Sequence, residues 1–595
     1  MTIGIDLGTT NSLVCVYRNG HTELIPNELG EYMTNSAVSI LEDGTLLIGK
    51  AAKERLITHP EQTAASFKRW MGTEQVIRLG RIGEEDGAET DPAVAESRSH
   101  SKVFLPHELS ALVLKQLYED ARRYLGEEIQ EAVISVPAYF DDNQRSATSL
   151  AAQLAGVPVK RLINEPSAAG LYYMMHYSGE DYRRLMVIDF GGGTLDVSIV
   201  ECFENIIEII AIAGDNRLGG DDIDRAIAEY FCKVNALTMD GLSANQRAAL
   251  LRQAENAKIA LSEEACGTLP CIRLGLDKVY EMVLDKTLLR EICEPYLYRM
   301  KSVIARAVRD SHLSPEELKD IVLVGGSARL AVLGDFLEEL VGKRPVLAGN
   351  PEFMVAQGAG ICAGIKSRLE GLRDVVMTDV CPFSLGIAVC DDVRDQNPHM
   401  ATMISRSSML PASRGETFYT LQDHQTAIRL DVYQGEGYYA SENRKIGELL
   451  MHVPPKAAGE EWVYVVFSYD INGILHVEAE CKGGDKRETV IVNPKVRLGD
   501  EELQRKVQEL KNLRFAAHGS QEDMLYIAKA ERLYMELIGK DREQVAEFIS
   551  RYRQILRQAD LIERKRMRNY ACEKIQEWES MMETELWCSD IRFTV

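Results

Sequence analysis

Several features that would reveal a protein class at once are missing from this sequence of 595 residues. Its 12 cysteines are scattered and include no Cys-x-x-Cys pair, so free thiols are expected rather than a zinc site or a disulfide framework. No apolar run reaches the roughly 18 residues that a membrane-spanning helix requires. No basic-then-apolar leader stands at the N-terminus. We therefore expect a cytoplasmic protein that has no membrane partner.

Positive charge is also scarce. The chain has 68 Lys and Arg against 91 Asp and Glu, which gives a net charge of −23. This excess disfavours nonspecific binding to nucleic acid, so no nucleic-acid partner is expected. The hydrophobic content of 45% is ordinary for a globular protein, and the length predicts several domains.

What the sequence does contain is a glycine turn between two apolar runs, at residues 185–198. Asp189 precedes three glycines at 191–193, and Thr194 and Asp196 follow them. Because glycine has no Cβ, its backbone N–H groups can approach a ligand closely. The two carboxylates are suited to lie beside a hydrated Mg²⁺.

The same order of residues occurs near the N-terminus, between residues 3 and 14. One glycine turn is weak evidence, since many hairpins contain one. Two turns that share an aspartate and a threonine favour a duplicated fold that holds the phosphates of a nucleotide from both sides. The polar and glycine residues of the first turn are Asp6, Gly8, Thr9, Thr10 and Asn11.

Two helix starts are predicted in the following region. Ser243 and Gln246 fit a capping box at the start of a long helix. Ser314 and Pro315, with an acid two residues later, predict a second helix before an apolar strand at 321–324.

Other candidate ligand contacts have ordinary interpretations when each is taken alone. Lys68 is then a surface lysine, and Glu165 is a solvated loop acid. The spacing of three polar residues on the long helix places them on one face, which would usually be a solvated surface. These three residues are Glu255, Lys258 and Ser262, and two further glycine pairs are Gly219 with Gly220 and Gly325 with Gly326.

The pattern changes after about residue 374. From 380 to about 495 short alternating strands dominate, and Asn472-Gly473 predicts a two-residue hairpin. From about 499 the pattern is helical, and Leu503, Val507 and Leu510 form one apolar stripe. An α/β region is therefore followed by an antiparallel β-domain and a set of helices.

Together these patterns resemble the 70-kilodalton heat-shock chaperone family of the DnaK type. The resemblance rests on the two glycine hairpins, Asn164-Glu165-Pro166, Val324-Gly325-Gly326 and the linker into a β-domain, and it covers nearly the whole chain. The start of the β-domain at 381–386 and the short helical tail are similar to the specialised bacterial HscC-type members.

The resemblance implies a multidomain fold and its boundaries. Residues 1–373 would form an actin-like ATPase domain built from a duplicated ribonuclease-H-like unit. Residues 374–379 would be the interdomain linker, 380–497 an antiparallel peptide-binding β-sandwich, and 498–595 an α-helical lid. ATP or ADP with Mg²⁺ would be bound, and K⁺ is a further ion that the resemblance permits.

Site residues follow from the same resemblance. The expected catalytic residues are Lys68, Glu165, Asp189, Thr194 and Asp196, and Asp6 and Asp189 are expected to hold the metal through water. The expected nucleotide contacts are Asp6, Gly8, Thr9, Thr10, Asn11, Gly191, Gly192, Gly193, Gly219, Gly220, Glu255, Lys258, Ser262, Gly325, Gly326, Ser327, Arg329 and Glu352. Glu352 stands where the family often has Asp, a change that keeps the charge.

The resemblance also implies partners. ATP hydrolysis would control the binding of extended, unfolded client peptides, and a J-domain co-chaperone would stimulate it. A nucleotide exchange factor acting on residues 215–299 is a further expectation. The expected peptide pocket is Ile387, Val389, Phe418, Ile428 and Leu430, and the expected J-protein contacts are Arg161, Asn164 and Asp379.

Three departures keep other functions open. Cys390 and Leu421 stand where common members have Met and Ala over the peptide, and Thr378 replaces an apolar linker residue. An ATP-dependent scaffold without peptide binding therefore stays an alternative. The first 380 residues alone would also suit an actin-like filament protein or a sugar-kinase-like phosphotransferase, but neither needs a linker, a sandwich and a lid.

Overall fold

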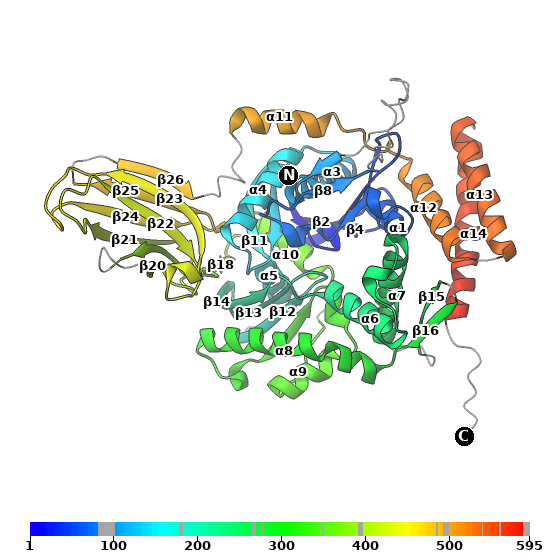
Figure 1. The fold of residues 1–595 in the computed structure, drawn as a ribbon, viewed down its shortest axis with the longest axis horizontal. Helices are drawn as coiled ribbons and strands as arrows, with labels where there is room; N and C mark the ends of the chain where they lie inside the picture. The colour runs from blue at the N-terminus through cyan, green and yellow to red at the C-terminus, as the bar shows by residue number, and fades with distance from the viewer. Residues whose placement is uncertain are drawn as a thin grey trace.

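The computed structural model of the chain describes residues 1–80, 102–177, 182–263, 269–276, 278–347, 349–390, 397–482, 486–491, 499–537, 539–558 and 561–586. Figure 1 shows an α/β body in the centre, a β-sandwich on one side and a group of helices on the opposite side. None of the helices in these ranges is long and apolar enough to cross a membrane.

The first lobe of the body is built on a mixed sheet with the strand order β11-β10-β1-β2-β3. β1 pairs antiparallel with β2 and parallel with β10. α3 and α4 pack against each other and enclose a large apolar core with this sheet. The elements are β1 (Thr2–Asp6), β2 (Asn11–Arg18), β3 (His21–Ile25), β4 (Thr34–Asn35), β5 (Ala37–Ile40), β6 (Leu46–Ile48), α1 (Lys50–Thr58), β7 (Thr63–Ala65), β8 (Ile77–Leu79), β9 (Lys102–Phe104), α3 (Pro106–Leu125), β10 (Glu131–Val136), α4 (Asp142–Ala155), β11 (Val159–Asn164) and α5 (Glu165–Tyr177).

The second lobe repeats this arrangement. Its sheet has the order β17-β12-β13-β14-β18, and β12 pairs antiparallel with β13 and parallel with β17. Alternate residues of β12 enter cores on the two faces of the sheet, as expected for a strand buried on both sides. The elements are β12 (Arg183–Phe190), β13 (Leu195–Phe203), β14 (Ile206–Asp215), α6 (Gly220–Val234), α7 (Ala244–Ser262), β15 (Cys271–Gly275), β16 (Val279–Val283), α8 (Lys286–Ser311), β17 (Asp320–Val324), α9 (Leu333–Val341) and β18 (Val376–Thr378). α10 (Met354–Lys366) follows α9 in the chain but packs on β1, β2 and β10 of the first lobe.

One of the two predicted helix starts is confirmed. The Ser243 hydroxyl accepts a hydrogen bond from the Gln246 backbone N–H at the start of α7. The expectation of a helix after Ser314 is wrong, because only a short 3₁₀ turn, Pro315–Glu317, forms there. β17 must pair with β12 from Asp320 onward, which leaves no length for a helix.

The two lobes meet where α5 crosses α10. A Cβ atom added to Gly358 of α10 would lie only 1.8 Å from the carbonyl oxygen of Ala168 in α5. The backbones of the two helices therefore touch at this point, and only glycine fits there.

The β-sandwich consists of two four-stranded sheets around one apolar core, with strand orders β20-β19-β22-β23 and β21-β24-β25-β26. The hairpin predicted at Asn472-Gly473 joins β24 to β25 in antiparallel order. Its turn is longer than the two residues expected, because the Asp470 N–H donates to the Ile474 carbonyl and residues 471–473 lie between them. The strands are β19 (Leu385–Val389), β20 (His399–Ile404), β21 (Ala412–Tyr419), β22 (Ala427–Gln434), β23 (Arg444–His452), β24 (Trp462–Tyr469), β25 (Leu475–Cys481) and β26 (Lys486–Ile491).

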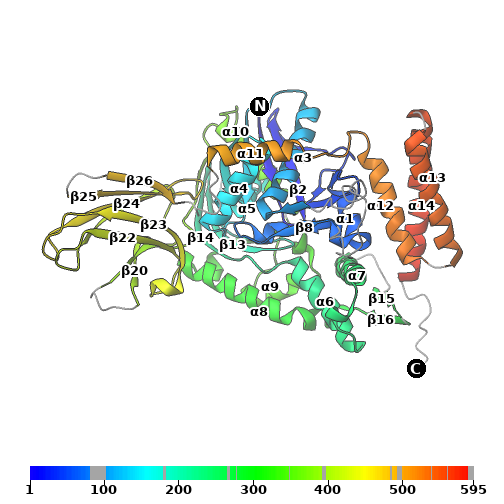
Figure 2. The same ribbon diagram turned by 45° about the horizontal axis from the view of Figure 1, so that its top comes forward.

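The C-terminal helices lie against the α/β body; α11 crosses it beside α4, and α12, α13 and α14 lie on the side away from the sandwich (Figure 2). The apolar stripe of α11 packs on the first lobe, where Leu510 joins the core. α12, α13 and α14 form a bundle with its own core, and α12 lies along α1. The helices are α11 (Asp500–Lys511), α12 (Gln521–Glu536), α13 (Gly539–Gln558) and α14 (Leu561–Leu586).

Candidate functional site

A cleft of about 1030 Å³ lies between the two lobes. Both glycine hairpins, α7 and the turn after β17 contribute to its lining. Three of the expected residues, Gly193, Gly219 and Asp196, adjoin the cleft rather than line it. The expected residues that line it are Asp6, Gly8, Thr9, Thr10, Asn11, Lys68, Glu165, Asp189, Gly191, Gly192, Thr194, Gly220, Glu255, Lys258, Ser262, Gly325, Gly326, Ser327, Arg329 and Glu352.

The first glycine turn is held by short polar contacts. The backbone N–H of Gly8 donates to the Ser12 hydroxyl at 3.1 Å, and the Ser36 hydroxyl donates to the Gly8 carbonyl at 2.7 Å. A Cβ atom on Gly8 would lie 2.0 Å from the Asn11 carbonyl oxygen. Position 8 therefore requires glycine, because the turn leaves no room for a Cβ atom.

The second turn faces the first one across the cleft. A Cβ atom on Gly192 would lie 2.0 Å from the hydroxyl oxygen of Thr10. The same loop is tied to the start of α6, because the N–H groups of Gly220 and Asp221 donate to the carbonyls of Gly191 and Gly192 at 3.0 and 2.8 Å. The two hairpins of the duplicated fold thus frame one space.

Four carboxylates meet one lysine at the base of this space. Lys68 is only 3% exposed, and its Nζ donates to Glu165 Oε1 at 2.8 Å. Burial and the charge of Glu165 raise the pKa of Asp6 to about 7. The same two causes raise the pKa of Asp196 to about 7 and that of Asp189 well above its usual range. The cluster therefore has more negative charge than its buried lysine offsets.

This cluster fits a hydrated magnesium ion by its chemistry. Carboxylates are the hard oxygen donors that Mg²⁺ prefers, and Asp196 Oδ2 is buried with no hydrogen-bond partner in the described residues. Within those ranges, no three acidic, His or Cys side chains are placed to hold an ion together. When bound, Mg²⁺ would offset the charge of the carboxylates and of a phosphate.

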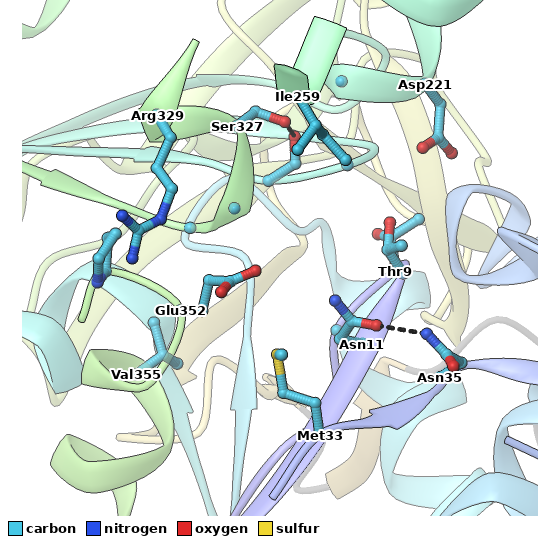
Figure 3. Close-up of a pocket in the computed structure, with 18 of the residues that line it drawn as sticks. Thr9, Asn11, Met33, Asn35, Asp221, Ile259, Ser327, Arg329, Glu352 and Val355 are labelled. Atoms are coloured by element: carbon cyan, nitrogen blue, oxygen red, sulfur yellow. Dashed lines mark hydrogen bonds between the residues drawn. The ribbon is translucent and has the colours of Figure 1, made fainter. Parts of the chain in front are cut away.

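The opposite wall of the cleft is formed by α7 and by the turn after β17. Lys258 contacts Asp224 at 2.7 Å and donates to the Gly220 carbonyl at 3.1 Å. The Ser327 hydroxyl donates to the Gly191 carbonyl at 2.9 Å, which ties this turn to the second hairpin. Figure 3 shows Ser327 and Arg329 on this wall, across the cleft from Thr9 and Asn11.

Sequence reasoning missed part of the lining. Met33 and Asn35 reach the cleft from the segment after β3, and Asn35 donates to the Asn11 side chain at 2.7 Å (Figure 3). Ile259 shares α7 with the expected residues and lies one turn from Ser262, so its spacing was a usable signal. The other unexpected lining residues are Leu13, Glu31, Tyr32, Lys50, Lys53, Asp221, Ile223, Asp224, Glu263, Leu330, Leu347, Pro351, Phe353 and Val355.

The three residues expected to contact a J-protein lie together at the linker. Asn164 donates to Asp379 Oδ2 at 2.7 Å, and Ser167 donates to the same oxygen at 2.9 Å. The positive charge of Arg161 acts on Asp379 from nearby. β18, which immediately precedes Asp379, extends the sheet of the second lobe by pairing with β14.

The residues of the expected peptide pocket divide into two groups. Ile387, Ile428 and Leu430 are buried in the sandwich core, whereas Val389 and Phe418 are half-buried. Packing in the core therefore accounts for three of the five without any ligand.

Comparison with known proteins identifies the group to which this architecture belongs. A family model described as "Hsp70 protein" matches residues 2–586. This chain belongs to the Hsp70 family. It is 38% identical to the chaperone protein DnaK of Thermotoga petrophila over 523 residues, which is 86% of this chain and 83% of the relative. It is 37% identical to the DnaK of Thermus thermophilus over 527 residues, with the same coverage.

Family membership establishes the general function. This Hsp70 is an ATP-dependent chaperone and an ATPase, and members of its family generally bind ATP or ADP with Mg²⁺. Stimulation by J-domain proteins is standard in the family. The family has an actin-like ATPase part, a β-sandwich and a helical lid, and the described elements are consistent with that layout.

Proposed function

We propose that ATP hydrolysis in the cleft between the lobes controls the β-sandwich through the linker. Lys68 and Glu165 position the attacking water, and Asp6 and Asp189 hold hydrated Mg²⁺. Thr194 and Asp196 order the water on the other side. The two glycine hairpins bind the phosphates, while the wall at Glu255, Lys258, Ser262, Gly325, Gly326, Ser327, Arg329 and Glu352 binds the adenosine. Hydrolysis of this kind depends on positioning and charge more than on a strong base.

The contact between Asn164 and Asp379 is the observation that carries this proposal. Asn164 is the chain neighbour of Glu165, which pairs with Lys68 in the cleft. Its side chain binds the linker directly. A shift of Glu165 during hydrolysis would therefore reach the contact between Asn164 and the linker through a single peptide bond, with no intermediate element required.

The arrangement of the parts is suited to the ATP-bound state. The Tyr469 hydroxyl of the sandwich donates to Asp142 at 2.9 Å, and Arg406 of the sandwich donates to Asp310 of α8 at 3.0 Å. α12, α13 and α14 of the lid lie on the opposite side of the body (Figure 1). In this state a client peptide would exchange freely, and hydrolysis would release the sandwich and the lid so that they close on the peptide.

The client site is proposed to lie at one end of the sandwich, with an extended peptide bonded through its backbone. Val389 and Phe418 are only half-buried and would contact the client, while Ile387, Ile428 and Leu430 would form the floor. Leu421 is 44% exposed beside this region and would take part in covering the peptide together with Cys390.

Finer assignments belong to the same proposal. The boundaries are 1–373, 374–379, 380–497 and 498–595, and the last region includes residues outside the described ranges. A J-domain protein would bind at Arg161, Asn164 and Asp379, and an exchange factor would act on the second lobe. The segment at 381–386, at the start of the β-domain, supports an HscC-type assignment. Use of K⁺ and a cytoplasmic location stay predictions.

Steady-state ATP hydrolysis, measured with and without extended aliphatic peptides at fixed Mg²⁺, tests this function. We expect a slow basal rate that rises with some peptides. Asp379→Asn should lose most of the stimulation while hydrolysis stays measurable, because its contact with Asn164 weakens. A rate that no peptide changes would favour the scaffold alternative.

A further inference from the structure

The lid of this Hsp70 meets the nucleotide cleft at its rim. α1 of the first lobe contacts both α7 of the second lobe and α12 of the lid. Leu525 of α12 packs against Ala51 and Ala52 of α1 in a small apolar cluster. α14 of the lid also contacts β15 of the second lobe directly, and α1 is the element that joins α12 to α7.

Two ion pairs join α1 to α7 across the cleft; in one the cation belongs to α1, and in the other it belongs to α7. Lys53 donates to Glu255 at 3.0 Å. One residue further along α1, Glu54 accepts from Arg252 at 3.0 and 3.3 Å. Asn245 of α7 adds a hydrogen bond to the Ile57 carbonyl at 2.7 Å. Opening of the cleft between these helices must break all three contacts.

The lid shares the second of these pairs. Arg532 Nε of α12 donates to Glu54 Oε2 at 2.8 Å, the same oxygen that accepts from Arg252. Glu54 is 6% exposed, and Arg532 is 5% exposed. Burial alone would raise the pKa of Glu54, but Arg252 and Arg532 lower it to about 2, so the carboxylate stays charged.

The second arginine does not repel the first, because the lid brings its own negative charge. Arg532 also donates to Glu536, at 2.7 Å, and to Glu579 of α14. Lys529 then pairs with Glu579 at 3.0 Å. The positive charge that Arg532 brings to Glu54 is therefore already partly offset by carboxylates of the lid.

We propose that Arg532 is a positioning residue that couples docking of the lid to closure of the nucleotide cleft. The proposal rests on the proposed function, in which the docked lid belongs to the ATP-bound state. With the lid in place, Glu54 is shielded from water, and loss of Arg252 on cleft opening leaves a buried carboxylate with one partner fewer. Once the lid leaves, water reaches Glu54 and the same opening costs less.

Nucleotide dissociation from the full-length chain tests the coupling. Arg532→Ala removes the ion pair of the lid with Glu54 and so favours the undocked lid, in which water reaches Glu54. The variant should therefore release a fluorescent ATP analogue about 5- to 10-fold faster, at the lower end of couplings between two sites. Release of the matching ADP analogue should not change, because the lid is then undocked. Glu54→Gln should also speed ATP release, and it alters no residue of the lid, so it keeps the test valid if Arg532→Ala disturbs the lid helices.

Two controls separate this path from a general effect on the lid. Lys574→Ala removes one positive charge from α14, where Lys574 forms an ion pair with Glu577 at 2.5 Å within the same helix, and should leave ATP release unchanged. In an Arg252→Ala background, Arg532→Ala should add little. An unchanged ATP release rate in Arg532→Ala, or the same acceleration in both backgrounds, would overturn the proposal. A chain that binds no ATP would instead refute the site assignment on which it rests.

Discussion

Replacement of Lys68 by alanine is the sharpest test of the chemistry in the cleft. The change removes a buried cation that lies 2.8 Å from Glu165 and lines the same cleft as Asp6 and Asp189. Loss of one positioned charge donor of this kind lowers hydrolysis by about 10²- to 10³-fold, or roughly 2.7–4 kcal/mol of transition-state stabilisation. ATP should remain bound, because both glycine hairpins and the α7 wall are unchanged.

The same substitution has a predictable cost in stability. Glu165 would keep its burial but lose its cation, which costs about 1–3 kcal/mol when a buried charged group is left without a partner. We expect a lower thermal midpoint for the variant without ATP, and partial recovery when ATP and Mg²⁺ are added.

Single-turnover hydrolysis of preloaded ATP is the assay that separates the chemical step from binding. Lys160→Ala serves as the control, since Lys160 is a surface lysine 59% exposed and paired with Glu131 at 3.4 Å. It removes the same charge and should leave the rate unchanged. Normal single-turnover hydrolysis by Lys68→Ala would refute the role given to this lysine.

Three further predictions follow from contacts already described. Ile428→Phe should weaken peptide binding and lower the stability of the sandwich, because Ile428 lies in its core; unchanged peptide affinity by fluorescence titration would remove it from the client site. Burial raises the pKa of Asp142 to about 7 at the sandwich interface, so docking takes up a proton. Docking of the sandwich on the α/β body should therefore be strongest at and below about pH 4, weaken by up to about tenfold per pH unit as the pH rises towards 7, and level off above pH 7. Asp142→Asn should abolish this dependence, which a fluorescence pair across the interface would measure; a flat profile in the unchanged chain would contradict the reasoning. Gly8→Ala should weaken ATP binding at least about tenfold, since the new methyl group would displace the Asn11 carbonyl, a loss equivalent to a single good hydrogen bond. Gly275→Ala has open space around it and should bind ATP normally in the same calorimetric titration.

Local sequence signals predicted much of the fold because they depend on neighbours in the chain. The cap at Ser243, the Asn472-Gly473 turn and the two glycine hairpins are all set by residues within a few positions. The helix expected after Ser314 failed because a partner strand more than a hundred residues away sets the start of β17.

Non-local packing limited the prediction of the site. Lys68 taken alone is an ordinary surface lysine, yet the fold buries it against Glu165, 97 positions later. The apolar stripe of α11 was visible, but its partner on the first lobe was not. The contact between Arg532 and Glu54 joins residues 478 positions apart, and no spacing in the sequence announces it.

The crossing of α5 and α10 has a mechanical consequence. At Gly358 and Ala168 the two helices touch through backbone atoms, with no large side chain between them. The lobes can therefore rotate about this point without a change of side-chain rotamer. α5 begins at Glu165, and α10 begins two residues after Glu352, so the N-terminal end of each helix lies at the cleft. A small turn at the crossing is thereby magnified at the nucleotide. The angle between the lobes therefore also depends on the groups at the cleft ends of the two helices and on the ion pairs between α1 and α7.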